Sequence, residues 1–171
     1  LPDDYWIIPY IQIRYENGDI DEIDALVVAP LYIVVVEVKN LASRGFFGEH
    51  IHTVNNHDRP NPIRQNDYRA KRIKGKLKQA NLREFQYVWI TDQVVLAQEP
   101  ARCEIEPLVK HKVVSLEEAS ARISNQEEML SANVSPNPVD PEAVFSALNI
   151  EPKIVTTTIA IPSICNVSKL L

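Results

Sequence analysis

The sequence predicts an α/β domain in which helices flank a mixed central β-sheet. Two apolar runs, 23–28 and 33–38, are too short for helices, and both are rich in β-branched residues. A break that contains Pro30 separates them, so we expect two neighbouring antiparallel strands. Further along, an amphipathic helix that starts near Asn61 leads into a third apolar run at 86–91. A helical crossover of this kind returns the chain parallel to the strand before it, which makes the predicted sheet mixed.

Length and charge place limits on the kind of protein this is. The chain has 171 residues, enough for one α/β domain of typical size with some additional structure. Its 18 Lys and Arg and 23 Asp and Glu give a formal net charge of −5. Nine of the basic residues nevertheless fall between Arg59 and Arg83, where Asp67 is the only acid. A polyanionic partner is therefore compatible with the acidic total, because local clustering of charge decides such binding.

Nothing in the sequence suggests a membrane protein or an exported one. No apolar run is long enough to span a bilayer, and the first residues do not resemble a signal peptide. The two cysteines, Cys103 and Cys165, lack the spacing of a metal site and are expected to be reduced thiols. We therefore expect a cytoplasmic protein with no membrane partner. The chain does not begin with methionine, so we expect it to be part of a longer protein.

The first strand is expected within residues 5–15, where apolar and polar residues alternate. Pro9 cannot donate to a sheet ladder, which places its part of the strand at an edge. Asn17-Gly18 is a strong signal for a hairpin turn and connects this strand to the run at 23–28. The first three strands should therefore form an antiparallel meander.

The two central runs bring four charged residues together. If residues 29–32 close a symmetric hairpin, positions whose numbers sum to 61 lie opposite each other, so Asp24 faces Glu37. By the same arithmetic Glu22 faces Lys39, and all four side chains share one face. Two opposed carboxylates destabilise a sheet, and a divalent cation between them is the simplest explanation. Glu22 is then either an accessory metal ligand or the partner of Lys39 in an ion pair, and we favour the partner.

Asn61 and Pro62 begin the clearest helix of the chain, as N-cap and first helical residue. Apolar residues recur with a period near 3.6 and should form its buried stripe: Ile63, Ala70, Ile73 and Leu77. The opposite side carries polar and basic residues: Gln65, Tyr68, Arg69, Arg72 and Lys76. Together with Arg64, the basic side chains form a candidate surface for nucleic-acid phosphates. The alternative is an ordinary solvated helix face.

Between the hairpin and this helix we expect a loop over residues 41–57, with one short strand at 50–54. His50, His52 and His57 fall here, but they lack a third ligand at metal spacing and make a poor zinc site. These histidines are instead expected to line a groove near the site or to face solvent.

The end of the chain has a different character. A capping box that begins at Ser115 predicts a helix continuing to about Met129. Beyond residue 131 prolines accumulate, ahead of one more short helix capped by Asp140. We therefore predict one domain over residues 1–130. Residues 131–171 are expected to be a proline-containing linker and C-terminal extension that leads into another domain.

Three blocks of this sequence occur in the same order in a known family. They are EIDALVV at 22–28, VVVEVKN at 34–40, and Asn61-Pro62 with Gln65. Over residues 5–124 the chain thereby resembles the nuclease-related domain, a branch of the PD-(D/E)xK nuclease superfamily. The resemblance implies a restriction-endonuclease-like core. The chain departs from the family pattern at Tyr32, where a glycine is usual, and no helix is evident before the first strand.

The resemblance also implies roles for individual residues. Asp24, Glu37 and the backbone carbonyl of Val38 would hold Mg²⁺ or Mn²⁺, and oxygen ligands of this kind suit such ions. Lys39 would orient the attacking water or stabilise charge on the phosphate. Gln65 would orient water or contact the substrate backbone.

We therefore expect a metal-dependent nuclease that hydrolyses phosphodiester bonds, with DNA as its substrate. The family further implies a prokaryotic protein in which this domain is joined to a kinase or helicase, in the same chain or a partner chain, with antiviral defence as a setting. The alternative is a catalytically silent nucleic-acid-binding or regulatory module. A third reading, an interaction domain without a nucleic-acid role, requires the basic helix to be incidental. Serine-hydrolase chemistry and a glycine-rich phosphate loop find no support, because none of the four glycines is at motif spacing.

Overall fold

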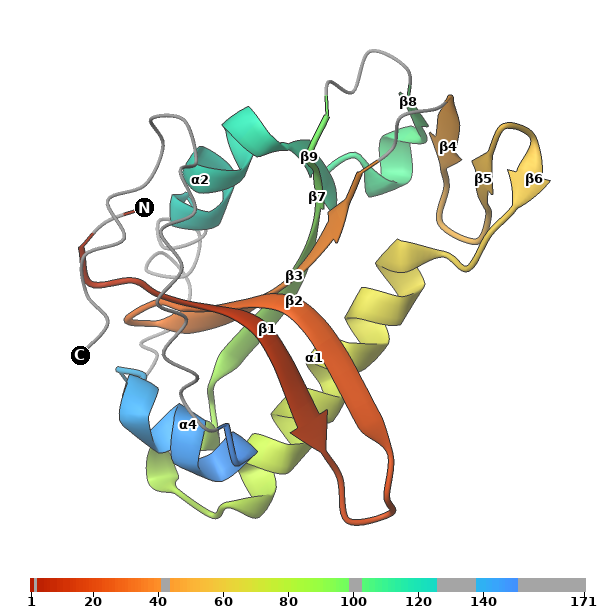
Figure 1. Ribbon diagram of the computed structural model, residues 1–171. Coiled ribbons are helices and arrows are strands. Elements are labelled where there is room, and N and C mark those ends of the chain that lie inside the picture. Colours follow the sequence, from red (N-terminus) through yellow and green to blue (C-terminus); the bar gives the residue numbers. More distant parts are fainter. Residues whose placement is uncertain (2, 41–43, 99–102, 126–137, 151–171) are drawn as a thin grey trace.

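A computed structural model describes residues 1, 3–40, 44–98, 103–125 and 138–150 (Figure 1). The main sheet has five strands in the order β1-β2-β3-β7-β9. These strands are β1 (Trp6–Arg14), β2 (Ile20–Val28), β3 (Tyr32–Lys39), β7 (Trp89–Leu96) and β9 (Val113–Ser115). β1, β2 and β3 form the expected antiparallel meander, and β7 and β9 continue the sheet parallel to β3. The prediction of a mixed central sheet is therefore confirmed.

A second, smaller sheet has the order β6-β5-β4-β8. Its strands are β4 (Gly45–Phe47), β5 (His52–Val54), β6 (His57–Asp58) and β8 (Cys103–Ile105). The sequence predicted only one short strand in this region, because strands of two or three residues carry too little periodicity to detect. Figure 1 shows this small sheet beyond the ends of β3 and β7, so it borders the end of β3 at which Glu37 and Lys39 lie.

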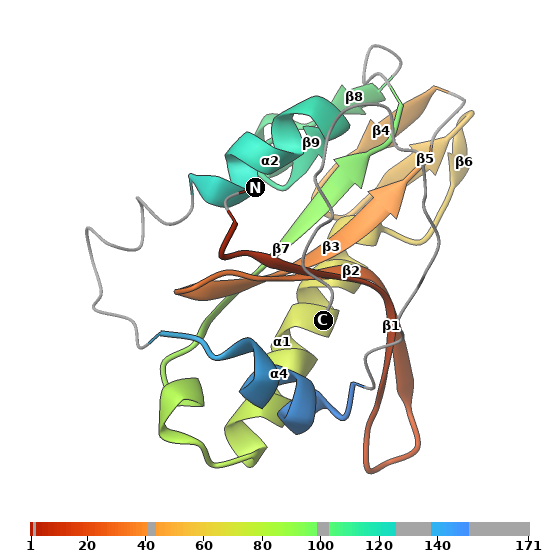
Figure 2. The same cartoon turned by 60° about the vertical axis from the view of Figure 1, so that its left-hand side comes forward.

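One face of the main sheet is covered by α1 (Pro62–Gln79) and α4 (Pro141–Leu148) (Figure 2). Asn61 caps α1 as predicted, and its side-chain oxygen accepts hydrogen bonds from two backbone N–H groups of the first turn. The predicted apolar stripe of α1 is buried. On this face lies the largest cluster of buried side chains, to which β3 contributes Ile33 and Val35.

The other face of the main sheet is covered by α2 (Leu116–Ser124), which begins with the predicted capping box at Ser115. Val34 and Val36 of β3 pack here in a second cluster with Ala119 and Ile123 of α2. β3 is therefore a central strand that is covered on both faces, as its unbroken apolar sequence indicated. Two short 3₁₀ helices, Arg83–Phe85 and Pro107–Val109, complete the described elements.

Tyr32, the first residue of β3, occupies the position at which the family usually has a glycine. Its side chain is fully buried, and its hydroxyl donates to the carbonyl oxygen of Ile123 at 2.5 Å. The ring of Tyr5 packs edge-on against it, with centroids 6.1 Å apart. The larger residue therefore links the β2–β3 turn to the end of α2, and it lies away from Glu37 and Lys39 at the other end of the strand.

Residues beyond the predicted domain boundary at 130 include a helix, α4, that packs on the core. α4 lies inside the range predicted as linker and extension, yet its Val144 and Leu148 are buried in the same cluster as Ile73 of α1. Asp140 caps this helix as expected. The predicted continuation of α2 to Met129, and the extension over 151–171, lie outside the described residues. A further domain after residue 150 therefore stays a prediction.

Within the described ranges, no helix is long and apolar enough to cross a membrane. Cys103 is a free cysteine, and burial raises the pKa of its thiol, which favours the protonated form at neutral pH. Cys165 lies outside the described residues.

Candidate active site

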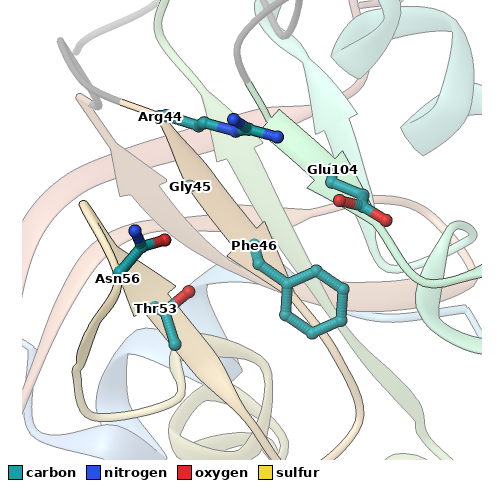
Figure 3. A pocket seen from close by; sticks show the side chains of 6 residues that line it. All are labelled: Arg44, Gly45, Phe46, Thr53, Asn56 and Glu104. Carbon is teal, nitrogen blue, oxygen red and sulfur yellow. The ribbon is translucent and has the colours of Figure 1, made fainter.

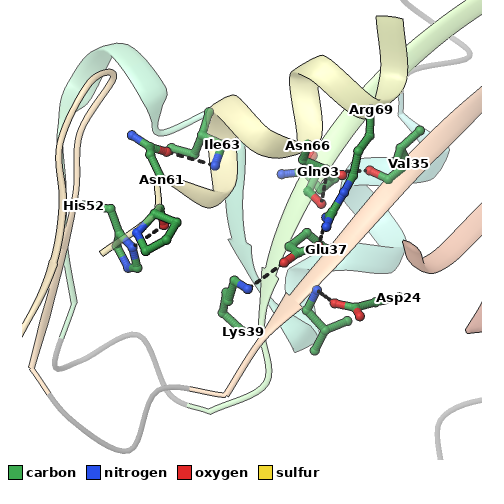
Figure 4. A network of polar contacts seen from close by, with 12 residues as sticks. Asp24, Val35, Glu37, Lys39, His52, Asn61, Ile63, Asn66, Arg69 and Gln93 are labelled. Atoms are coloured by element: carbon green, nitrogen blue, oxygen red, sulfur yellow. Dashed lines mark hydrogen bonds and ion pairs between the residues drawn. The ribbon is translucent and has the colours of Figure 1, made fainter. Parts of the chain in front are cut away.

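The register of the β2–β3 hairpin agrees with the arithmetic of the sequence. Four pairs, from Val28 opposite Ile33 to Ala25 opposite Val36, all have numbers that sum to 61. The ladder then stops, one position before Asp24 would face Glu37. Both carboxylates therefore lie just beyond the last residue pair of this ladder. Figure 4 shows the two side chains beside β3.

Asp24 occupies the edge of β3 that β2 has left. Its Oδ2 accepts a hydrogen bond from the backbone N–H of Val38 at 2.7 Å. The next carbonyl along, that of Lys39, accepts from Ala97 on the β7 side of the strand. Because successive residues of a strand direct their backbone groups to opposite edges, the Val38 carbonyl points to the same edge as Asp24. One carboxylate and one carbonyl oxygen are thus directed to the same edge of the sheet.

Glu37 is buried, with 5 % of its surface exposed, and points toward α1. Its Oε1 accepts from the Lys39 ammonium at 2.5 Å, and its Oε2 is in contact with the Arg69 guanidinium. A carboxylate with so little solvent is stable as an anion only when cations or hydrogen bonds compensate it. The two contacts supply that compensation and hold Lys39 on the same side of β3 as Glu37.

The expected ion pair between Glu22 and Lys39 is wrong. Glu22 lies opposite Gln12 of β1, and its Oε1 accepts from the Gln12 side-chain amide at 3.0 Å. Lys39 pairs with Glu37 instead. The physical reason is that the symmetric register between β2 and β3 ends at Ala25, while β2 and β1 remain paired down to the turn. Glu22 therefore belongs to the β1–β2 hairpin and not to the site.

The basic face predicted on α1 is largely engaged within the molecule. Arg69 contacts Glu37, and Lys76 donates to the carbonyl oxygen of Arg14 at 2.8 Å. Arg72 pairs with two acids of the β1–β2 hairpin, Asp19 at 3.1 Å and Asp21 at 3.3 Å, and its guanidinium lies 3.7 Å from the centre of the Tyr15 ring. In the free domain these three side chains are therefore held by internal partners, and their contact with phosphates stays a prediction. Arg64 is the exposed member of the predicted set, and it has no ion pair among the described residues.

Asn61 and Gln65 both lie at the N-terminal end of α1. Gln65 is exposed and lies one turn before Arg69 on the same side of the helix, since residues four apart share a face. The Asn61 side-chain amide donates to the carbonyl oxygens of Gly48 and Glu49, so it fastens the small sheet to the helix start. In the Asn-Pro-x-x-Gln block, Asn61 therefore has a structural role, whereas the side chain of Gln65 is exposed.

The nuclease-related domain family has a sequence model that matches residues 1–97. The chain belongs to the nuclease-related domain family. The match covers more than half of the chain and ends just after β7, so it includes both strands of the site and the whole of α1. No curated protein and no solved structure matches the chain significantly.

Asn66 is a residue of this nuclease-related domain that sequence reasoning missed. It is fully buried on the inner side of α1, and its amide donates to the carbonyl oxygens of Val35 at 2.9 Å and Gln93 at 3.2 Å. It thereby ties α1 to two neighbouring strands directly beside Glu37 (Figure 4). A signal was present, because position 66 falls in the helical period of the buried stripe between Ile63 and Ala70.

We expect Asn66→Ala to lower the free energy of unfolding by about 2 kcal/mol, because two buried carbonyl groups lose a donor. Urea unfolding followed by circular dichroism measures this change. Gln79→Ala, at the exposed end of the same helix, is the control and should change the stability by less than about 0.5 kcal/mol. Equal stabilities for the two variants would show that the Asn66 contacts do not hold α1 in place.

His52 is a second buried polar residue near the site. Its ring stacks on Phe47 with centroids 4.7 Å apart, and its Nδ1 lies 3.1 Å from the carbonyl oxygen of Pro60. A carbonyl only accepts, so Nδ1 carries the proton. Burial lowers the pKa of His52, and the positive charge of Lys39 lowers it further, against an opposing contribution from the Pro60 hydrogen bond. His52 is therefore a neutral imidazole that packs the small sheet next to Lys39.

Asp92 of β7 is a third buried polar residue near the site. It lies opposite Val35 in the parallel ladder, is nearly inaccessible, and pairs with Lys112 at 2.6 Å. The pKa of Asp92 is raised, because burial outweighs the opposing effect of the Lys112 ammonium. This pair connects β7 to the turn before β9, and Asp67 of α1 lies 3.7 Å from the same ammonium. Its contacts are those of a structural network under α1.

Proposed function

We propose that this nuclease-related domain hydrolyses phosphodiester bonds with the help of a divalent cation, Mg²⁺ or Mn²⁺, and that DNA is its substrate. The observation that supports this best is the gathering of Asp24, the Val38 backbone, Glu37 and Lys39 at the point where β2 and β3 separate. Charged side chains at that position are unnecessary for the sheet, since apolar residues form the rest of β3.

The donor atoms suit such a cation. Asp24 and Glu37 offer carboxylate oxygens, and Val38 offers a backbone carbonyl, which are the hard ligands that Mg²⁺ and Mn²⁺ take. No group of three or more His, Cys, Asp or Glu side chains that could hold a metal occurs in the described ranges, so the backbone oxygen would be the third protein ligand. A bound divalent cation would polarise the phosphoryl group and lower the pKa of a coordinated water.

Lys39 and Arg69, which contact Glu37, would affect both metal binding and phosphate binding. Both oxygens of Glu37 are engaged, one by Lys39 and one by Arg69, so a bound cation would lie beside two positive charges. We expect the repulsion to displace one of these side chains from Glu37. Either ammonium or guanidinium is then available to a phosphate. Lys39 is held on the site side of β3 and would stabilise the negative charge that develops on the phosphoryl oxygens.

The face of α1 next to the site would orient the substrate. Gln65 and Arg64 are exposed in the first turn of the helix, where an amide and a guanidinium can contact the nucleic-acid backbone. Arg69, Arg72 and Lys76 already have partners within the domain, which leaves fewer of their donors for a phosphate. We therefore assign the first contacts to Arg64 and Gln65.

A second candidate function is a catalytically silent nucleic-acid-binding or regulatory module attached to a kinase or helicase. It is favoured by the fact that Asp24 and Glu37 both have partners within the domain without a metal. In that case the charged cluster would serve to end the β2–β3 ladder, and the basic residues of α1 would remain for binding.

A cleavage assay separates these two functions. Labelled single- and double-stranded DNA, and the corresponding RNA, are incubated with the domain in Mg²⁺, in Mn²⁺ and in excess EDTA. We expect products from DNA with either metal and none in EDTA. Intact substrate under every condition, in a preparation that binds the same oligonucleotides, would establish the silent module.

A further inference from the structure

The small sheet carries a cavity that the proposed chemistry does not use. It has a volume of about 280 Å³ and lies over the outer face of β4, β5 and β8 (Figure 3). Its lining is Arg44, Gly45, Phe46, Thr53, Asn56 and Glu104. A space of this size suits one planar group of small-molecule dimensions rather than a whole protein segment.

The lining combines one aromatic ring with two charged side chains. Phe46 lies opposite Thr53 on β5 and opposite Glu104 on β8, so three strands present a row of side chains on one face. Arg44 precedes Phe46 by two residues and shares that face, whereas Phe47 points inward to the core. Neither Arg44 nor Glu104 forms an ion pair with any described residue, although both are exposed.

One edge of the Phe46 ring lies close to Gly48. A Cβ atom added at Gly48 would lie 2.9 Å from Phe46 Cε1 and 2.9 Å from a carboxylate oxygen of Glu106. That oxygen in turn accepts from the backbone N–H of Glu49 at 2.9 Å. One edge of the ring is therefore packed against Gly48, while the side chain also lines the cavity, where a planar ligand would contact it.

We propose that this cavity binds an unstacked guanine of a single-stranded nucleic acid, an inference that rests on the proposed function and names a feature of its substrate. Phe46 stacks on the base, and Arg44 pairs with an adjoining phosphate. The Glu104 carboxylate only accepts hydrogen bonds and offers two oxygens. Guanine presents two neighbouring donors on its Watson–Crick edge, N1–H and the 2-amino group. Thymine presents a single N3–H between two carbonyl oxygens that repel a carboxylate.

The test is a binding measurement without metal, so that no cleavage takes place. Two fluorescein-labelled 15-nucleotide DNA strands are compared by fluorescence anisotropy in EDTA: oligo(dT), and the same strand with three central guanines. We expect the wild-type domain to bind the guanine strand about tenfold more tightly. Equal binding of the two strands would overturn the proposal.

Two variants assign the effect to the cavity. Glu104→Gln should reduce the guanine preference to about twofold or less, because the amide cannot accept both hydrogen bonds. Phe46→Ala should weaken binding of both strands about tenfold. Glu117→Gln, an equivalent charge change on the exposed surface of α2, is the control and should retain the preference. If Phe46→Ala does not fold, Phe46→Leu removes the ring but keeps apolar volume, and the same weakening is expected. A full preference in folded Glu104→Gln would contradict the assignment.

A competition assay distinguishes binding of a strand from binding of a free nucleotide, and a cleavage assay tests the proposed nuclease function separately. Free dGMP should displace the guanine strand only at concentrations far above the affinity of the strand; equal affinities would make the ligand a free nucleotide and overturn the strand assignment. A domain that keeps its guanine preference but cleaves nothing would refute the proposed nuclease function alone. A domain that cleaves DNA but shows no guanine preference would refute the present inference alone.

Discussion

Replacing Lys39 by Met should lower the rate of phosphodiester cleavage about 1000-fold, while nucleic-acid binding is retained. The ammonium group of Lys39 contacts Glu37 in the free domain, and we expect its main contribution when charge develops on the phosphate. Methionine keeps most of the aliphatic stem, and Glu37 still has Arg69 as a partner, so the fold should persist. Initial cleavage rates under saturating substrate, together with anisotropy in EDTA, measure the two quantities.

The matched control for Lys39 is Lys71→Met. Lys71 lies on the exposed side of α1, where it pairs with Asp67, so this variant makes the same change of charge away from the site. It should cleave at the wild-type rate. A Lys39→Met domain that cleaves within about threefold of wild type would remove Lys39 from the chemistry.

Replacing Asp24 by Ala should abolish cleavage and also the stabilisation of the domain by metal. At a concentration 100 times its dissociation constant, a metal that binds only the folded state stabilises that state by about 2.7 kcal/mol. For a domain of this size the midpoint of thermal unfolding should then rise by about 5–10 °C in the wild-type protein. The Asp24→Ala protein should show little rise, because a carboxylate ligand is gone.

The structure also changes what Asp24→Ala should do without metal. From the sequence alone, removal of one of two opposed carboxylates should relieve repulsion and stabilise the domain slightly. Asp24, however, accepts from the Val38 N–H, and Glu37 is compensated by Lys39 and Arg69. We therefore expect the metal-free variant to lose about 1 kcal/mol. Asp24→Asn keeps an acceptor for Val38 and should recover that stability while remaining unresponsive to metal. An undiminished metal response in Asp24→Ala would contradict the proposed ligand set.

The hairpin and the mixed character of the sheet could be predicted because they depend on local sequence and on the rule for helical crossovers. β-branched runs, a proline-containing turn and the symmetric register fix which residues of β2 and β3 face each other, and the pairs from Ala25 to Ile33 agree. The helix start at Asn61 and the parallel return of the chain at β7 follow from capping and from the crossover rule.

The partners of the charged residues could not be predicted in the same way. They depend on where two strands separate and on which hairpin lies along which helix. β1 and β2 extend beyond the point where β3 leaves them, and their turn runs beside α1 (Figure 1), so Asp19 and Asp21 reach Arg72. A helical period identifies the buried stripe of α1, but it says nothing about which other element occupies the flank of the helix. The predicted partner of Glu22 was wrong because the β2–β3 ladder ends at Ala25, before it reaches Glu22.

The small sheet escaped prediction because its stability comes from tertiary contacts. Its strands have two or three residues each, and β4 pairs in parallel with β8, which follows it by more than fifty residues. Phe47 and the start of α1 anchor it through a shared cluster with Val94 and Leu96 of β7. Such long-range pairings leave no periodic signal in the sequence.

The most direct test of the proposed metal site is a crystal structure of the domain grown with Mn²⁺ and examined by anomalous scattering. We predict a manganese peak between Asp24, Glu37 and the Val38 carbonyl, with Arg69 or Lys39 withdrawn from one oxygen of Glu37. An anomalous peak elsewhere, with Glu37 still held by both cations and Asp24 still bonded to the Val38 N–H, would contradict it.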